Sequence, residues 1–439
     1  MAAAPDRYHA LDSLRAFAMF LGIALHAGLS FLEQPPAFWP VRDDRPIPLS
    51  DVLLYAVHDF RMQLFFLLAG FFGCLLRQRY GAAGMARHRL KRVALPFALG
   101  VVFIAPTVLA ALLYAEVGNV HSEPVRGEAS PARAFAASLV ADHPEASDAG
   151  VVGDVFLSGA FVAGVRPFHL WFLYFLLYFY VAALLLDRPL RWFAGTRAAA
   201  ACDSAFRLVV GGWLRVPVLS LLTVPLLLPM RTWSVDTPAG WEPELRLLAY
   251  YGGFFAVGWA LYRHRDLVPA FGRRWAAHLV VANVVVMPVM AGLVITGAGA
   301  ERSGADVTAL WVGACAAMAA YTWLMVCGLW GGFLRWFARE TAWSRYLADA
   351  SYWCYLASIT PIVLLQFWVR DWQVPGLVKF TLLTAVTTAG LLASYQWGVR
   401  YTLIGAILNG RKHRSQRAPG ERRPDRASEL VRDDSLAAE

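Results

Sequence analysis

Residues 11–32 have the sequence LDSLRAFAMFLGIALHAGLSFL and form the first long apolar stretch of the chain. The stretch is long enough to cross a bilayer as one helix, yet it contains Asp12, Arg15 and His26. A helix would place Arg15 and His26 on nearly the same face, about 16 Å apart along its axis. Asp12 stands one turn before Arg15 and can pair with it. Ionisable groups are costly in hydrocarbon, so we interpret this face as functional; the alternative is a snorkelling arginine and a histidine satisfied by a neighbouring helix.

The composition is that of a membrane protein. Of the 439 residues, 58% are hydrophobic and only 16% are charged, whereas a soluble protein has about 25% charged residues. Repeated apolar stretches predict an all-α polytopic membrane protein with about ten transmembrane helices. The predicted spans are approximately residues 11–32, 51–76, 93–117, 169–187, 211–230, 246–262, 277–297, 307–331, 347–369 and 377–400.

The basic residues predict the topology. Arginine-rich connections, in residues 77–92, 188–207, 263–274 and 335–345, alternate with connections that contain only scattered arginines. The positive-inside rule therefore predicts that both termini are cytoplasmic. The net charge of +9 follows this membrane pattern and does not indicate a nucleic-acid partner.

The predicted organisation is one membrane domain, residues 1–410, followed by a disordered cytoplasmic tail, residues 411–439. The long outer segment 118–168 is rich in Ala, Gly, Pro, Ser and Asp, and it is either a disordered lid or a small acceptor-binding element. The five cysteines form no metal-type pair, so we expect neither a metal site nor a disulfide.

The second span also contains ionisable residues. His58 and Arg61 are one turn apart and share a helix face, and Asp59 can compensate the charge of Arg61 from an adjacent helix. One interpretation is a structural ion pair at the outer interface. The functional interpretation places these residues beside His26, because both regions approach the outer half of the bilayer. Gly70 and Gly73 are expected to permit close helix approach.

Two further motifs flank later spans. Arg89 and Arg92 belong to a short basic loop, residues 77–92, that leads to Pro96 in the first turn of the third span. They are either positive-inside anchors or ligands for phosphate groups. His169 and Trp171 open the fourth span, where aromatic residues either form an interfacial belt or stack on sugar rings.

Several motifs occur in order along the chain. They are Arg15-x10-His26, Phe60-Arg61-Met62 with Gly70-Phe71-Phe72, Arg89-x-x-Arg92, His169-Leu170-Trp171, Ser351-Tyr352-x-x-Tyr355 and Arg400-Tyr401 with Asn409-Gly410. Together they resemble the membrane-bound acyltransferase-3 superfamily, from Arg7 to about Arg411. Within it, the chain looks most like the members that succinylate osmoregulated periplasmic glucans. It departs from them at Ala69, where relatives often have Ser, and at Ser358, where a histidine is common.

The resemblance implies transfer of a succinyl or acetyl group from cytoplasmic acyl-coenzyme A to a hydroxyl of an extracytoplasmic glycan, most simply osmoregulated periplasmic glucan. The protein would be a multi-pass component of the bacterial inner membrane, with the lipid bilayer, acyl-CoA and the glycan as partners and no permanently bound cofactor. The sequence leaves open whether it forms a homo-oligomer. The expected roles are as follows: His26 and Arg15 catalytic; Arg89, Arg92 and Arg61 donor-binding; Asp12, His58 and Asp59 supporting; His169 and Trp171 acceptor-binding.

Two other function classes fit the same residues. A proton-coupled transporter or flippase would use intramembrane His, Asp and Arg as a proton relay, and it would make no covalent product. A non-catalytic scaffold for glycan assembly would have no need of the ionisable Arg15–His26 face. Analysis of envelope glycans with and without the protein would separate these classes.

Overall fold

The computed structural model describes residues 8–33, 35–123, 130–238 and 240–410. Within these ranges the chain is helical and has no strand, only an isolated bridge between Thr232 and Ser234. The predicted all-α class is therefore confirmed. By length and composition, six helical segments of the described chain can cross a membrane, or up to eight if each of two bent pairs is one span. The count of ten and the side of the termini stay predictions.

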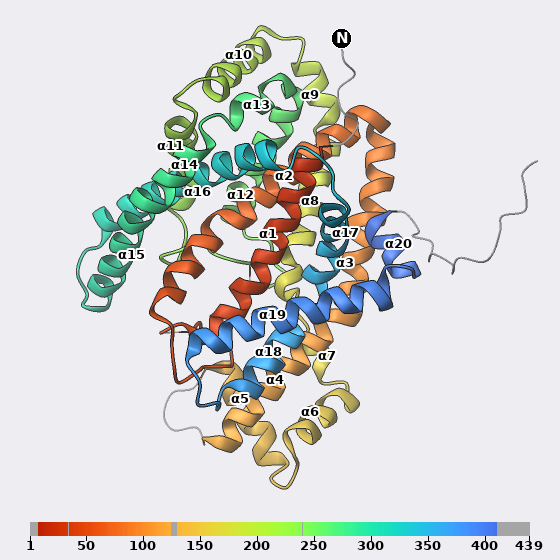
Figure 1. The fold of residues 1–439 in the computed structure, drawn as a ribbon, viewed down its shortest axis with the longest axis vertical. Helices are drawn as coiled ribbons and strands as arrows, with labels where there is room; N and C mark the ends of the chain where they lie inside the picture. The colour runs from red at the N-terminus through yellow and green to blue at the C-terminus, as the bar shows by residue number, and fades with distance from the viewer. Residues whose placement is uncertain (1–7, 34, 124–129, 239, 411–439) are drawn as a thin grey trace, which may run out of the picture.

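Helix α1 (His9–Gly28) lies near the centre of the molecule (Figure 1). Leu11, Leu14, Ala18 and Ile23 are almost completely buried along it. The helix packs against α2 (Pro48–Arg89), α16 (Thr308–Trp336), α17 (Ala342–Ala357), α18 (Ile359–Val369) and α19 (Gly376–Ser394). The first apolar stretch of the sequence is thus the element that the other helices surround.

The basic run at residues 77–92 is not a loop, contrary to the sequence-based expectation. Helix α2 continues to Arg89, and only Gly81 leaves helical geometry, with φ +72° and ψ −179°. Arg, Ala and Met are good helix formers, and a positive φ is accessible to glycine at little cost, so the run stays helical and bends at one residue. The spans predicted at 51–76 and 93–117 lie on the two sides of this bend within one helical segment, Ser50–Ser122.

Proline residues explain three widened helical turns. Three of the four described π-helical segments end two residues before a proline: η2 (Leu90–Ala94) before Pro96, η3 (Gly100–Ile104) before Pro106, and η6 (Val281–Val286) before Pro288. A proline ring clashes with the carbonyl four residues earlier and cannot donate to it, so a wider turn relieves the clash. The chain then continues as α3 (Leu95–Leu99), α4 (Ala105–Ser122) and α15 (Met287–Arg302).

The segment 118–168, predicted to be on the outer side, is mostly helical where it is described. After α4 it forms α5 (Pro131–Asp142), α6 (Asp148–Leu157) and α7 (Phe161–Gly164). Val117, Ala136 and Val151 form a small separate core with no exposed surface. A disordered lid therefore does not fit these described residues. Figure 1 shows α5 and α6 at one end of the long axis and α10 (Arg197–Gly211) at the other.

The remaining helices complete the domain. They are η1 (Leu29–Phe31), η4 (Phe168–Leu170), α8 (Trp171–Leu185), α9 (Asp187–Phe193), α11 (Arg215–Leu227), α12 (Leu245–Arg263), η5 (Arg265–Leu267), α13 (Val268–Phe271), α14 (Trp275–Val280), η7 (Tyr395–Val399) and α20 (Leu403–Asn409). The spans predicted at 211–230 and 347–369 belong to bent pairs, α10 with α11 at 117° and α17 with α18 at 65°. The predicted tail 411–439 lies outside the described residues.

Helices α2 and α12 approach closely at two glycines. A Cβ atom at Gly70 would overlap the backbone carbonyl of Phe255, and one at Gly258 would overlap the backbone carbonyl of Leu67. Only residues without a side chain permit this backbone contact. The close approach that the sequence predicted at Gly70 is confirmed, and its partner on α12 is Gly258.

Candidate functional site

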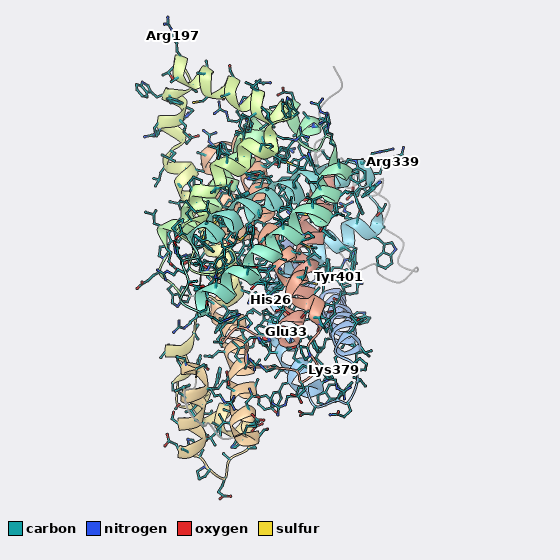
Figure 2. The ribbon with its side chains drawn as sticks, turned by 90° about the vertical axis from the view of Figure 1, so that its left-hand side faces the viewer. His26, Glu33, Arg197, Arg339, Lys379 and Tyr401 are labelled. Atoms are coloured by element: carbon teal, nitrogen blue, oxygen red, sulfur yellow. The ribbon has the colours of Figure 1, made fainter. Side chains whose placement is uncertain are left out.

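The two ends of the Arg15–His26 face have different surroundings. Arg15 forms an ion pair with Asp12, with 3.3 Å between the nearest atoms, and its side chain is 40% exposed. His26 is half-buried and lies near the middle of the long axis of the molecule, as Figure 2 shows. The expected Asp12–Arg15 pair is therefore present. The face presents a cation at one end and an imidazole deep inside the domain.

The hydrogen bonding of His26 defines its tautomer. Its Nδ1 atom lies 2.8 Å from the carbonyl oxygen of Gly22 on the preceding turn. A carbonyl oxygen can only accept, so Nδ1 carries the proton and donates it. The Nε2 atom then keeps a free lone pair, which is the form of imidazole that can accept a proton. The geometry thus prepares His26 to act as a base through Nε2.

Arg61 lies directly against the helix turn that precedes His26. A Cβ atom at Gly22 would overlap its guanidinium group, so glycine is needed there for the guanidinium to fit. The Nε atom of Arg61 is buried without a hydrogen-bond partner, and Nη2 has only a 3.7 Å contact with the sulfur of Met62. Within the described ranges, no carboxylate forms an ion pair with Arg61. A buried cation without a counter-ion is a site that favours an anion.

His58 and His169 complete a cluster around His26. Both histidines and Arg61 interact electrostatically with the His26 ring. All four side chains are only half-buried, so part of each remains accessible. The expectation from helix spacing that His58 and Arg61 share a face agrees with this arrangement. The structure therefore brings together His26, His58, Arg61 and His169, from helices α1 and α2 and from η4, which directly precedes α8.

Asp59 has a different environment from the one expected. Its carboxylate accepts a hydrogen bond from the hydroxyl of Ser234 at 3.2 Å, and its backbone oxygen accepts one from Thr322 at 2.6 Å. In the described part of the chain it forms no ion pair with Arg61 or His26. The expected compensation of Arg61 by Asp59 was wrong, because residues two apart on a helix point to nearly opposite sides.

The loop between α11 and α12, which we call the outer loop after its predicted side, contacts His58 and Asp59. The carbonyl of Val235 accepts a hydrogen bond from His58 Nε2 at 2.7 Å. Asp236 holds the loop together through its ion pair with Arg246 and a 2.6 Å hydrogen bond from Thr232. Burial acts to raise the pKa of Asp236, but the hydrogen bonds from Thr232 and Arg246 outweigh it and hold the pKa below its usual value.

His169 enters the cluster at a strained turn. Phe168, just before it, has φ +42°, which is unfavourable for a residue with a side chain. The ring donates through Nε2 to the carbonyl of Leu356 at 3.0 Å, and the hydroxyl of Tyr355 donates to the His169 carbonyl at 2.7 Å. The Nδ1 atom of His169 is buried without a partner. His169 therefore presents an unpaired acceptor next to the other cationic and imidazole groups.

Trp171 does not present its ring to this cluster. It is 5% exposed and packs among the rings of Phe66, Phe175 and Tyr251. A ring that is covered on all sides contributes packing energy and offers no face to a sugar. The structure gives Trp171 a role in the core, and its contact with an acceptor stays a prediction.

Arg15, Arg89 and Arg92 converge at the other end of the face, and we call them the arginine cluster. Arg15 repels both of the other cations electrostatically. Arg89 lies over the ring of Tyr180, 4.3 Å from its centroid, and its Nε and Nη2 atoms are buried without partners. Arg92 donates to the carbonyl of Leu408 at 2.6 Å. Three adjacent guanidinium groups, of which Arg89 has unused donors, form a site suited to phosphate groups.

Sequence reasoning missed two contributors to these sites. Tyr180 supports Arg89 from α8, and nothing in the apolar sequence around it marks that contact. Gln366 contacts the last turn of α1 from α18. Its position inside the apolar run 359–369 was a usable signal, because a lone amide in such a run needs buried partners. Among the described residues, no group of three His, Cys, Asp or Glu residues could hold a metal ion.

Comparison with known proteins gives a consistent result. The family described as "Acyltransferase domain" (acyltransferase-3) matches residues 8–396. Glucans biosynthesis protein C of Escherichia coli strain SMS-3-5 is 31% identical over 119 residues, which cover 27% of this chain and 30% of that protein. The proteins of the same name from strains O1:K1 and O157:H7 are 30% identical over the same lengths. The chain thus matches less than a third of the length of these relatives, and no solved structure matches it.

Proposed function

Because this chain belongs to the acyltransferase-3 family of membrane proteins, we propose that it moves an acyl group from cytoplasmic acyl-CoA to a hydroxyl of an extracytoplasmic glycan. The observation that carries the proposal is the free Nε2 lone pair of His26, deep in the domain and on the face that begins at Arg15. Such a base is needed where a thioester and a hydroxyl meet. The acceptor is osmoregulated periplasmic glucan, by analogy with the relatives named glucans biosynthesis protein C.

In the proposed reaction, His26 acts as the general base. Nε2 takes the proton of the acceptor hydroxyl while the hydroxyl oxygen attacks the thioester carbonyl carbon. The carbon–sulfur bond breaks, and the thiolate of coenzyme A receives the proton from the imidazolium. The Nδ1–Gly22 hydrogen bond keeps the ring in the required tautomer throughout. No metal or bound cofactor takes part in these steps.

Arg61 stabilises the negative charge that forms on the thioester oxygen during attack. Its guanidinium group lies against Gly22, one turn from His26, and has no carboxylate partner in the described chain. A cation that is already in place in a site of low dielectric stabilises developing charge without reorganising. His58 lies beside Arg61 and is held by the outer loop. The unpaired Nδ1 atom of His169 is available to accept a hydrogen bond from the glycan.

The arginine cluster binds the phosphate groups of the donor. Coenzyme A is polyanionic, and Arg15, Arg89 and Arg92 supply adjacent cations, with unused donors on Arg89. The thin pantetheine arm follows the α1 face for the roughly 16 Å between residues 15 and 26, so the bulky nucleotide stays outside the bilayer. The acyl group is succinyl or acetyl.

The proposed location is the bacterial inner membrane, with both termini in the cytoplasm. The alternating arginine-rich connections support this orientation. The donor then enters at the arginine cluster, and the acceptor enters from the side of α4 to α7. The acceptor and donor sites are thus on opposite sides of the membrane.

The test is His26→Asn in purified protein, reconstituted in vesicles with acyl-CoA and glucan. We expect wild-type protein to release free coenzyme A thiol and to make acylated glucan, and the variant to do neither. His278→Asn is the matched control, because His278 is another half-buried histidine in an apolar helix, outside the cluster. A variant at position 26 with wild-type transfer would refute the mechanism. Glucan or proton movement without a covalent product would favour a transporter.

A further inference from the structure

A chain segment on the outer side of the domain is tied to η1, the short helix that directly follows α1. We call residues 35–47 the outer strap; it connects η1 to α2. The backbone N–H groups of Asp43 and Ile47 donate to Ser30 and Phe31 at 2.9 Å each. Lys379 on α19 donates to the Asp43 carboxylate at 2.8 Å, and both side chains are at most 2% exposed. Figure 2 shows Lys379 between His26 and the end of the molecule formed by α4 to α6.

Trp39, within the outer strap, lies beside the His26 ring. Their ring centroids are 6.2 Å apart and the rings are tilted by 31°. The indole N–H of Trp39 donates to Oε1 of Gln366 at 3.0 Å. Trp39 is 8% exposed, so its contact with His26 is an interior one.

The amide nitrogen of Gln366 binds the backbone of His26 and of the next residue. Its Nε2 atom donates to the carbonyl oxygens of His26 and Ala27, at 3.0 Å in each case. These carbonyls belong to the last turn of α1, where the helix offers few further N–H groups; the His26 carbonyl also accepts from the backbone N–H of Leu29. Gln366 is 1% exposed. One buried amide therefore holds both the ring beside His26 and the backbone that carries His26.

Burying the Gln366 amide costs free energy unless all three of its hydrogen bonds are formed. A buried amide that loses its partners retains its desolvation cost, and so do the carbonyls that it leaves. In an apolar helix the same volume filled by leucine would pack without that cost. Packing alone therefore does not explain a glutamine at position 366, whereas a need to hold His26 does.

We propose that Gln366 is a positioning residue for the reaction. It fixes Trp39 and the last turn of α1 so that Nε2 of His26 points to the place where donor and acceptor meet. Because Trp39 belongs to the outer strap, the same amide joins the acceptor side of the domain to the base. This inference rests on the proposed function of His26.

The test compares Gln366→Leu, Gln366→Glu and Trp39→Phe with wild-type protein. Leucine at position 366 removes all three hydrogen bonds. Glutamate keeps an acceptor for Trp39, and in its ionised form it has no donor for the two carbonyls of α1. Phenylalanine at position 39 keeps a ring but loses the N–H. Trp323→Phe is the matched control, because it removes a buried indole hydrogen bond, 2.9 Å to Thr223, outside the cluster.

We expect Gln366→Leu to lower kcat about tenfold or more, since each misplaced contact near the reacting atoms is expensive, with the donor KM unchanged. Gln366→Glu should be impaired similarly, and Trp39→Phe less. Adding Trp39→Phe to Gln366→Leu should lower kcat no further, because the bond it removes is already lost. Trp323→Phe should keep the wild-type kcat.

Three results would overturn the inference. One is a Gln366→Leu variant whose kcat equals that of the control Trp323→Phe, in an assay where wild-type protein transfers acyl groups. Another is a change in the donor KM alone. If Gln366→Leu does not fold, Trp39→Phe decides, and an unchanged kcat in that variant refutes the coupling. An inactive wild-type protein would instead refute the proposed function, and this inference with it.

Discussion

Replacing Gly22 by alanine should impair catalysis, although we do not place the side chain at position 22 in contact with a substrate. A Cβ atom at this position would overlap the guanidinium group of Arg61. Since non-bonded carbon and nitrogen atoms need about 3.5 Å, the guanidinium must move by more than ~1 Å. Arg61 is then displaced from the place where we propose that negative charge develops.

A displacement of this size predicts a large effect on the rate. A misplacement of about 1 Å near the reacting atoms can cost roughly 100-fold, so we expect kcat to fall about 10- to 100-fold in Gly22→Ala. Alanine is a better helix former than glycine by about 1 kcal/mol, so helix α1 itself is not weakened. Loss of activity without loss of folded protein is therefore the expected signature.

The assay follows release of coenzyme A thiol by reconstituted protein, with thermal unfolding measured in parallel. Gly28→Ala is the matched control on the same helix, because its Cβ atom would only reach an ordinary 3.7 Å contact with Phe380. That variant should keep wild-type kcat. Wild-type kcat in Gly22→Ala would refute the claim that the position of Arg61 beside His26 matters for the reaction.

Three further predictions concern the donor site, the outer loop and helix packing. Replacing Arg89 and Arg92 with Gln should weaken acyl-CoA binding and make the remaining binding less salt-sensitive, and unchanged donor affinity would contradict the phosphate site. The ionised carboxylate of Asp236 stabilises the folded state, because its pKa is lower in the folded protein than in the unfolded chain. This stabilisation is complete above the unfolded pKa of about 4 and is lost as the pH falls through the folded pKa. Wild-type protein should therefore lose more thermal stability than Asp236→Asn between about pH 5 and pH 3, and equal losses would contradict this assignment. Gly258→Ala should cost about 1–3 kcal/mol of stability by pushing α12 away from α2, whereas Gly292→Ala, with open space around it, should not.

Local helix geometry made part of the site predictable. The spacing of Asp12, Arg15 and His26 within one apolar stretch was enough to place them on one face, because successive turns of a helix repeat at fixed angles. The same rule predicted that His58 and Arg61 share a face of their helix. Close approach at Gly70 followed from the absence of a side chain. These statements depend only on neighbours a few residues apart in the chain.

Contacts between distant segments were not predictable in the same way. The hydrogen-bond partners of Asp59, which are Ser234 and Thr322, were not predicted because they are far away in the sequence. The helix at 77–92 was missed for a different, local reason: the run was taken as a loop, although its residues favour a helix and only Gly81 bends it. Gln366 was missed since its contact with His26 joins positions separated by 340 residues. A single sequence contains no direct signal for such pairs.

The ties between the first and the last helices have a consequence for biosynthesis. His26 is made near the start of translation, but Gln366 and Lys379, which hold its surroundings, are made near the end. At about 5–20 residues per second, the ribosome needs roughly 20–70 s to synthesise the intervening chain. During that interval the first helix is in the membrane with its last turn unsupported and Asp43 without its lysine. Under the proposed function, we therefore expect acyl transfer to begin only after the final helices have inserted, and a chain that ends before Gln366 to transfer acyl groups more slowly than the whole protein.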